Sequence, residues 1–240
     1  MPDVGDRSRD EAVALRTIRV AGTIALVLGL ALLVVLPAEP AVENVPGFTT
    51  AVLGFELAST PAHVAGILGG AGTPERARTV RRMMLGTWID FLFALAYPTF
   101  YVGIAMFLEV RAGMRRGLLL VVTALAVTMA VADGLENGEL LRLCGPLDVA
   151  SMAESLARLR SFTLTKWYAI FVTSGLLVPF LWHAGGRWRW AALAFGGAAA
   201  FGALSGLTLP AIEGGSMMLL VAWVVTYGCS FGRPDRDRPG

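Results

Sequence analysis

The stretch Gly117–Leu141, GLLLVVTALAVTMAVADGLENGELL, joins a membrane-spanning run to a polar end. Its first sixteen residues carry no charge and are long enough to enter a bilayer. Asp133, Glu136 and Asn137 then fall within five positions and, at about 100° per residue, share one face of a helix. Ionised groups cost roughly 2.5–3.5 kcal/mol each near a membrane centre, so this helix needs partners for its acids.

The composition of the whole chain agrees with this stretch. Hydrophobic residues make up 55% of the 240 residues and charged residues only 16%, whereas a soluble domain carries about 25% charged residues. We therefore predict an all-α membrane protein, a bundle of about six transmembrane helices with a partly helical extracytoplasmic loop. Its expected partners are membrane lipids and a small amphipathic ligand, and its oligomeric state is left open.

Other function classes lack their usual signals. The formal net charge is only +2, and no basic stripe with interleaved aromatic residues suggests a nucleic-acid partner. The chain has no phosphate-binding lysine loop, no dinucleotide-binding glycine motif, no zinc-protease motif and no serine-hydrolase elbow. We therefore expect no cofactor and assign no metal ligand.

Uncharged runs divide the chain into spans and connections. Residues 1–18 are a predicted cytoplasmic tail, residues 19–232 a single transmembrane domain with an outer loop over 38–82, and residues 233–240 a disordered tail. A cleaved signal peptide in place of the first span is the alternative. The six predicted spans cover about residues 20–36, 84–108, 117–137, 164–182, 190–209 and 212–229.

Local motifs predict helix ends and helix contacts. Thr60 followed by Pro61 is typical of a helix start. A capping box at Ser151-x-x-Glu154 predicts a short amphipathic helix in the connection before residue 164.

Two glycines predict how the last two spans pack. Gly202 and Gly206 lie four positions apart and would share one face of a helix. Small residues at this spacing let helix backbones approach closely, and the connection to the next span is short. We therefore expect the spans over 190–209 and 212–229 to form an antiparallel hairpin that packs through these glycines.

The arginine distribution orients the bundle. Outside the predicted spans, the side that holds the termini has twelve arginines and the other side has seven. The positive-inside rule then places both termini in the cytoplasm of a cell-membrane protein. This topology brings Asp90, Asp133, Glu136 and Lys166 to one depth near the outer face, where the outer loop supplies Glu56.

The candidate site consists of these groups and their neighbours. Asp90 is followed by eighteen uncharged residues, and Tyr97 shares its helical face. Lys166 is the only lysine and the natural counter-ion of Asp133, although snorkelling to the headgroups is the alternative. The candidate catalytic residues are Asp90, Asp133, Glu136 and Lys166, and the candidate binding residues are Glu56, Tyr97 and Asn137.

Four short motifs carry a resemblance. The first two are Phe55-Glu56-Leu57-Ala58 and Asp90-x-x-Phe93-x-x-x-Tyr97, and the others are Asp133-x-x-Glu136-Asn137 and Lys166. Together they resemble a group of uncharacterised bacterial integral membrane proteins. The resemblance covers about residues 50–182, so the last two predicted spans lie outside it. It implies a cluster of acids and a lysine but no particular chemistry.

Three functions are compatible with these residues. The first is a small membrane enzyme or ligand-binding protein that uses the carboxyls as acid/base groups. The second is a proton-coupled carrier, against which the spans show no obvious inverted repeat. The third is a structural subunit in which the cluster is an ion-paired helix clamp. The sequence does not decide whether the protein is an enzyme.

Overall fold

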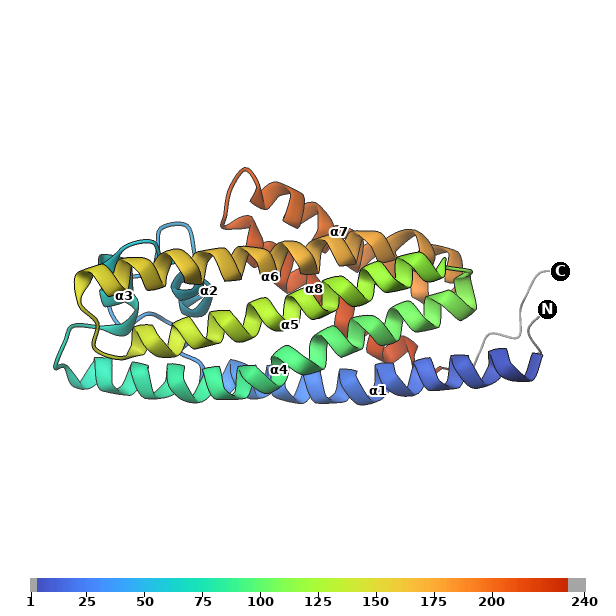
Figure 1. Cartoon of the computed structure of the whole chain (residues 1–240), viewed down its shortest axis with the longest axis horizontal. Helices are drawn as coiled ribbons and strands as arrows, with labels where there is room; N and C mark the ends of the chain where they lie inside the picture. The colour runs from blue at the N-terminus through green and yellow to red at the C-terminus, as the bar shows by residue number, and fades with distance from the viewer. Residues whose placement is uncertain (1–3, 233–240) are drawn as a thin grey trace. The chain divides into compact units, whose positions relative to one another are not determined.

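The computed structural model describes residues 4–232, and these contain helices and no strand. The predicted disordered tail over 233–240 lies outside the described residues. In chain order the helices are α1 (Val4–Val35), α2 (Ala51–Glu56), α3 (Pro61–Leu68), α4 (Pro74–Ala112), α5 (Arg116–Cys144), α6 (Val149–Ala184), α7 (Trp188–Ser205) and α8 (Ala211–Cys229) (Figure 1).

Five helices in the described part of the chain are long and apolar enough to cross a membrane, namely α1, α4, α5, α6 and α8. This all-helical architecture suggests a membrane location and is compatible with a multi-pass protein. The prediction of six spans is not confirmed, because α7 is not among the five. Its 18 residues open with Trp-Arg-Trp and are otherwise mostly alanine and glycine, which are less apolar than leucine or valine.

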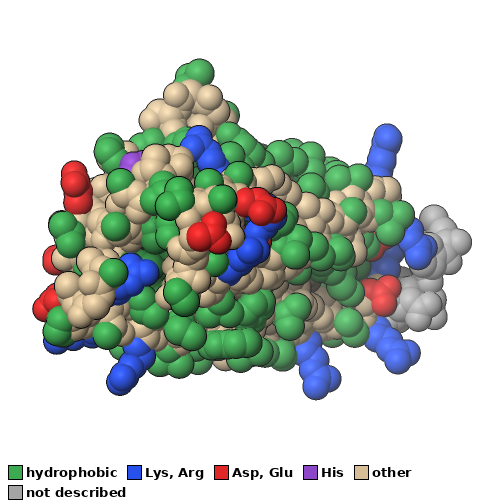
Figure 2. Space-filling view, turned by 60° about the vertical axis from the view of Figure 1, so that its left-hand side comes forward, with side chains coloured by type: hydrophobic (Ala, Val, Ile, Leu, Met, Phe, Trp, Pro, Cys, Tyr) green, Lys and Arg blue, Asp and Glu red, His purple; other side chains and the backbone are tan. Residues whose placement is uncertain are grey.

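Apolar side chains face outward from the long helices. On α1, Val27, Leu30 and Leu33 are 62%, 64% and 71% exposed. Figure 2 shows hydrophobic side chains over much of the visible surface, with acidic and basic side chains in small separate groups. A surface of this kind suits contact with lipid better than contact with water.

Two predicted connections are helical in the structure. Residues 4–18 of the predicted tail form the first half of α1, where Ala14 and Ile18 are fully buried. The connection before residue 164 is also helical, because α5 continues to Cys144 and α6 begins at Val149. The helix expected in the connection is thus present, but as the first turns of α6 and not as a separate short helix, because charged residues do not stop a helix that has a buried stripe.

The start of α6 also corrects the predicted capping box. Asp148 precedes the helix, and its carboxylate accepts hydrogen bonds from the Ser151 N–H at 2.9 Å and the Ser151 hydroxyl at 2.7 Å. Ser151 is therefore inside the first turn, and Glu154 pairs with Arg158 instead of closing a box. Aspartate satisfies the free N–H groups of a first turn at least as well as serine does.

The short helix α3 has the predicted start. The Thr60 hydroxyl accepts a hydrogen bond from the His63 N–H at 3.2 Å, and Pro61 occupies the first helical position. Gly69 ends the helix with a φ of 93°, a conformation that favours glycine. Thr60 and Pro61 are thus confirmed as a start signal.

The residues divide into two compact units. We call Val27–Leu95 with Val127–Ala169 the cluster unit, and Met1–Leu26 with Ala96–Ala126 and Ile170–Gly240 the aromatic unit. Helices α1, α4, α5 and α6 contribute residues to both units.

Within the aromatic unit, α7 and α8 pack against each other. A side chain at Gly206 would meet only the carbonyl of Ala203 in its own helix, and one at Gly202 would clash with Phe171 of α6. The predicted packing of this helix pair through Gly202 and Gly206 is therefore wrong. The close approaches between α7 and α8 are instead at Gly197, beside Met218, and at Gly214, beside Phe201.

Candidate functional site

Lys166 lies at the centre of a buried polar cluster in the cluster unit. Its ammonium nitrogen, Nζ, is 2.6 Å from Glu136 Oε1, 3.3 Å from Asp133 Oδ1 and 3.5 Å from Glu56 Oε2. The predicted pairing with Asp133 is present, but the nearest carboxylate is that of Glu136. The side chains of Lys166, Asp133 and Glu136 are 7%, 3% and 0% exposed, so water does not screen these contacts.

The helical register of α5 explains why two acids reach the same ammonium group. Asp133 and Glu136 are three positions apart, and side chains at this spacing lie one above the other on a helix. Lys166 approaches from α6, and both acids and the lysine are among the buried charged residues of the unit. The cluster therefore links two long helices by charge as well as by apolar packing.

Glu56 enters the cluster from α2, which lies in the connection between α1 and α4. Its backbone carbonyl accepts a hydrogen bond from the Thr163 hydroxyl at 3.1 Å, and its Oε2 accepts one from Trp167 Nε1 at 3.3 Å. Figure 1 shows α2 beside α6. All residues of α2 except Val52 are buried, so this six-residue helix is packed into the unit.

Asp90 and Asn137 extend the cluster toward α4. Asp90 is half-buried and lies within electrostatic range of Glu56, Asp133 and Lys166. The Asn137 side chain interacts with the Asp90 carboxyl. However, neither its nitrogen nor its oxygen has a hydrogen-bond partner of regular geometry among the described residues. Asp90 is thus the most accessible acid of the cluster.

The acids of the cluster outnumber its cations. The carboxyls of Glu56, Asp133 and Glu136 lie within 3.5 Å of the single ammonium of Lys166, and a fourth, that of Asp90, lies within its electrostatic range. One oxygen, Glu136 Oε2, is buried without a hydrogen-bond partner in the described part of the chain. An unpaired buried charge costs several kcal/mol, and carboxylates that share a site do not all ionise.

A second group of charged residues in the same unit is more exposed. Glu139, on α5, is 2.7 Å from Arg158 Nε on α6 and accepts a hydrogen bond from the Ser155 hydroxyl. Arg158 also pairs with Glu154 and is 31% exposed. This group lies nearer the helix ends, is partly open to solvent, and has a cation for Glu139. It needs no further partner.

The structure unites most of the predicted site. Six of its seven residues, all except Tyr97, lie in this cluster. Tyr97 is fully buried in the aromatic unit, where its ring stacks on that of Trp223 at 5.7 Å between centroids. The sequence analysis missed Thr163 and Trp167, which hold Glu56. Thr163 lies three residues before Lys166 and Trp167 one residue after it, and this proximity in sequence was the only available signal.

The chemistry of the cluster is that of an acid/base or cation-binding centre. Among the described residues, no three histidine, cysteine or acidic side chains are arranged to hold a metal ion. The groups available are proton donors and acceptors and one indole N–H. No protein-family model, curated protein or solved structure matches the chain.

Proposed function

We propose that this chain is a multi-pass membrane protein whose acid/lysine cluster binds the cationic group of a small amphipathic ligand. The observation that carries the proposal is the excess of acid, with four carboxyls around one ammonium. A positively charged group would supply the missing counter-ion. In its absence protons neutralise the surplus carboxyls, so binding of the cation releases protons.

Asp90 is the carboxyl that would meet the ligand first. It is half-buried, whereas Asp133 and Glu136 are buried and already lie within 3.3 Å of Lys166. Ligand binding in a membrane also needs an apolar partner surface for the rest of the molecule. The outer faces of α1, α4 and α5 carry exposed leucine and valine side chains. An alkyl chain beside these faces is in an environment that it prefers.

A helix clamp is the second candidate, and one observation favours it. Lys166 of α6 contacts carboxylates from α2 and α5, so it ties three segments of the chain together. A clamp built on one ammonium group needs only one carboxylate. In a purely structural role, burial of the other acids would only lower the stability of the protein. The proposed orientation places the termini in the cytoplasm and the cluster toward the outer face. The resemblance to bacterial membrane proteins is part of the same proposal.

A comparison of two ligands tests the proposal. Dodecylamine is cationic at neutral pH, and dodecanol has the same alkyl chain and no charge. We expect dodecylamine to raise the thermal unfolding temperature of the purified protein in a neutral detergent, and dodecanol to leave it unchanged. The heat of binding should depend on the ionisation enthalpy of the buffer, because protons leave the cluster.

Asp90→Asn is the diagnostic variant, and Glu154→Gln is its matched control. Glu154 lies in the same unit, but its side chain is 68% exposed and pairs only with Arg158 at the surface. Asp90→Asn should abolish stabilisation by dodecylamine, and Glu154→Gln should keep it. Equal stabilisation of the two variants would show that the amine binds elsewhere and would leave the clamp as the function of the cluster.

A further inference from the structure

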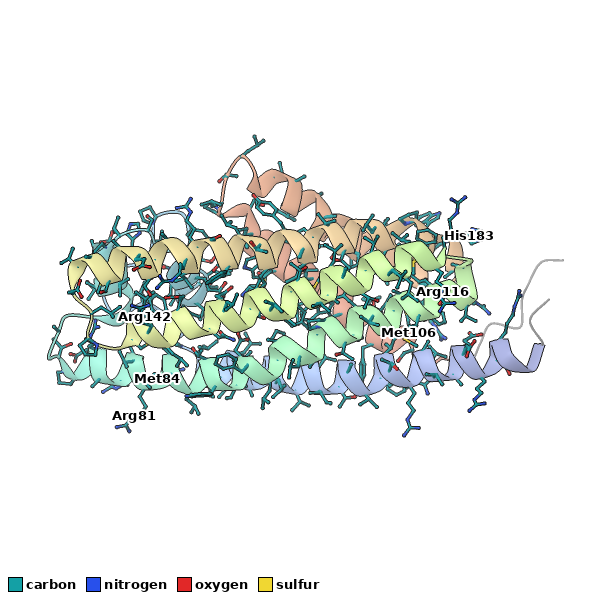
Figure 3. All side chains as sticks on the ribbon, in the orientation of Figure 1. Arg81, Met84, Met106, Arg116, Arg142 and His183 are labelled. Carbon is teal, nitrogen blue, oxygen red and sulfur yellow. The ribbon has the colours of Figure 1, made fainter. Side chains whose placement is uncertain are left out.

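An open groove of about 760 Å³ lies in the aromatic unit, where α1 and α5 begin and where α4 and α6 end. Figure 3 shows three of its lining residues, Met106, Arg116 and His183, near these helix ends. Pockets of roughly 300–1,000 Å³ hold small ligands in many proteins. The groove is separate from the acid/lysine cluster, and the proposal for that cluster does not involve it.

Arginines outnumber acids among the residues that line the groove. Arg7, Arg111 and Arg116 line it, and the acids among its lining residues are Asp10 and Glu109. The three arginine side chains make no hydrogen bond or ion pair with the side chains described over residues 7–232. A guanidinium group presents its N–H donors in a planar fork that matches two oxygens of a phosphate. The groove therefore offers phosphate-binding groups that the protein itself does not use.

Apolar side chains line the same groove. Val13, Met106, Val110 and Leu119 line the groove beside the arginines. These residues belong to α1, α4 and α5, which are among the helices apolar enough to span a membrane. A ligand that suits both the arginines and the apolar side chains carries an anionic phosphate and a hydrocarbon chain.

We propose that this groove binds an anionic phospholipid, with its phosphate on Arg111 and Arg116 and an acyl chain along Val110 and Leu119. The groove lies where apolar helices end, which is the depth of lipid headgroups. Trp182, near the end of α6, supports this depth, because it is 49% exposed and lies beneath the Arg189 guanidinium at 5.3 Å. Tryptophan and arginine side chains are typical of the membrane interface.

Native mass spectrometry of the full chain in neutral detergent, with phosphatidylglycerol or phosphatidylcholine added, tests this proposal. We expect the wild-type protein to retain phosphatidylglycerol over phosphatidylcholine. The double variant Arg111→Gln with Arg116→Gln should bind phosphatidylglycerol about tenfold more weakly, because it lacks two charge-assisted contacts. Arg116→Gln alone should show a smaller loss of affinity for phosphatidylglycerol. This single variant replaces the double variant in the test if the double variant does not fold.

Arg78→Gln with Arg81→Gln is the matched control, because it removes the same charge from exposed positions in the cluster unit. Figure 3 shows the Arg81 side chain extending away from the helices. This control should retain phosphatidylglycerol as the wild type does. Equal loss in both double variants would overturn the proposal in favour of general surface attraction. Competition by free glycerol phosphate at the lipid's own concentration would overturn it in favour of a soluble phosphate ligand.

Discussion

Two buried polar networks, one in each unit, satisfy their groups in different ways. In the aromatic unit the Tyr101 hydroxyl lies 3.1 Å from the Ser174 hydroxyl and accepts a hydrogen bond from Trp223 Nε1 at 3.3 Å. These groups are neutral and satisfy one another. In the cluster unit one ammonium faces several carboxyls, and Glu136 Oε2 has no hydrogen-bond partner among the described residues.

This difference separates a structural role from a ligand-binding role. A neutral network is complete when its hydrogen bonds are made, and removing one bond costs about 1 kcal/mol. A charged cluster in a low-dielectric interior is complete only when its charges balance. The cluster unit does not reach this balance with its own side chains. It therefore needs protons or a cationic partner, whereas the network of Tyr101, Ser174 and Trp223 needs neither.

The largest expected effect comes from removing the only cation of the cluster. Lys166→Met should destabilise the protein by about 3–5 kcal/mol, because it leaves buried carboxyls without a counter-ion. Lys166→Met combined with Glu136→Gln should recover much of this loss, since the nearest acid is then neutral. Thermal unfolding in detergent measures both variants.

Arg81→Met is the control for removal of a positive charge in the same unit, because Arg81 is exposed. It should leave stability nearly unchanged. If the effects of Lys166→Met and Glu136→Gln simply add, the two side chains are not coupled, and the contrast between the units disappears.

The second prediction concerns packing in the aromatic unit. Gly202→Ala should destabilise the protein by about 1–3 kcal/mol, because the added methyl group would clash with Phe171 at a tight helix contact. Gly206→Ala should have little effect, since Gly206 is exposed and has a helical φ of −65°. Unfolding temperatures compare the two. A larger effect at Gly206 would restore the packing predicted from the sequence.

The third prediction tests whether the aromatic network is only structural. Tyr101→Phe removes the hydroxyl that joins Ser174 and Trp223 and should cost about 1 kcal/mol. It should not change the response to dodecylamine. Tyr168→Phe, at a side chain 39% exposed, is the control for loss of a surface hydroxyl. A loss of the amine response in Tyr101→Phe would assign the aromatic unit a part in ligand binding.

The smallest expected effect comes from removing Asp148, an exposed acid that accepts its hydrogen bonds from Ser151. The Ser151 backbone N–H, and then its hydroxyl, lower the pKa of Asp148 below its ordinary value. The pKa of Asp148 is thus lower in the folded state than in the unfolded state. The cap therefore stabilises the protein at pH values above the ordinary pKa of about 3.9, and this stabilisation is lost as the pH falls through the folded-state pKa. Asp148→Ala should therefore lower the unfolding temperature slightly at pH 7 and less at pH 3. An equal difference at both pH values would contradict the assignment of Asp148 as the cap.

The acid cluster could be predicted from sequence because its signals are local. Asp133 and Glu136 are three positions apart on an apolar helix, and Lys166 is the only lysine. Glu56 was found through the predicted topology, which returns the connection over 38–82 to the same end of the bundle as these residues. The helix cap at Thr60 could also be predicted from sequence, because it depends on a few neighbouring residues.

Features that depend on tertiary contacts could not be predicted. Gly202 faces Phe171 of α6 and not α8, and nothing in a glycine spacing identifies the partner helix. Tyr97 shares a helical face with Asp90 in sequence, but its ring stacks on Trp223, which is 126 positions later in the chain. The competition between Asp148 and Ser151 for the cap of α6 was decided by where the helix begins, which sequence patterns define only to within a few residues.

The most direct test of the central claim is infrared difference spectroscopy of the carboxyl groups at neutral pH. If acids outnumber cations in the cluster, the wild-type protein should show the C=O stretching band of a protonated carboxylic acid. Glu136→Gln or Asp90→Asn should alter this band, the exposed control Glu154→Gln should leave it intact, and dodecylamine should diminish it. Absence of a protonated-carboxyl band that depends on these residues would mean that every acid in the cluster is ionised and already compensated, which would contradict the account.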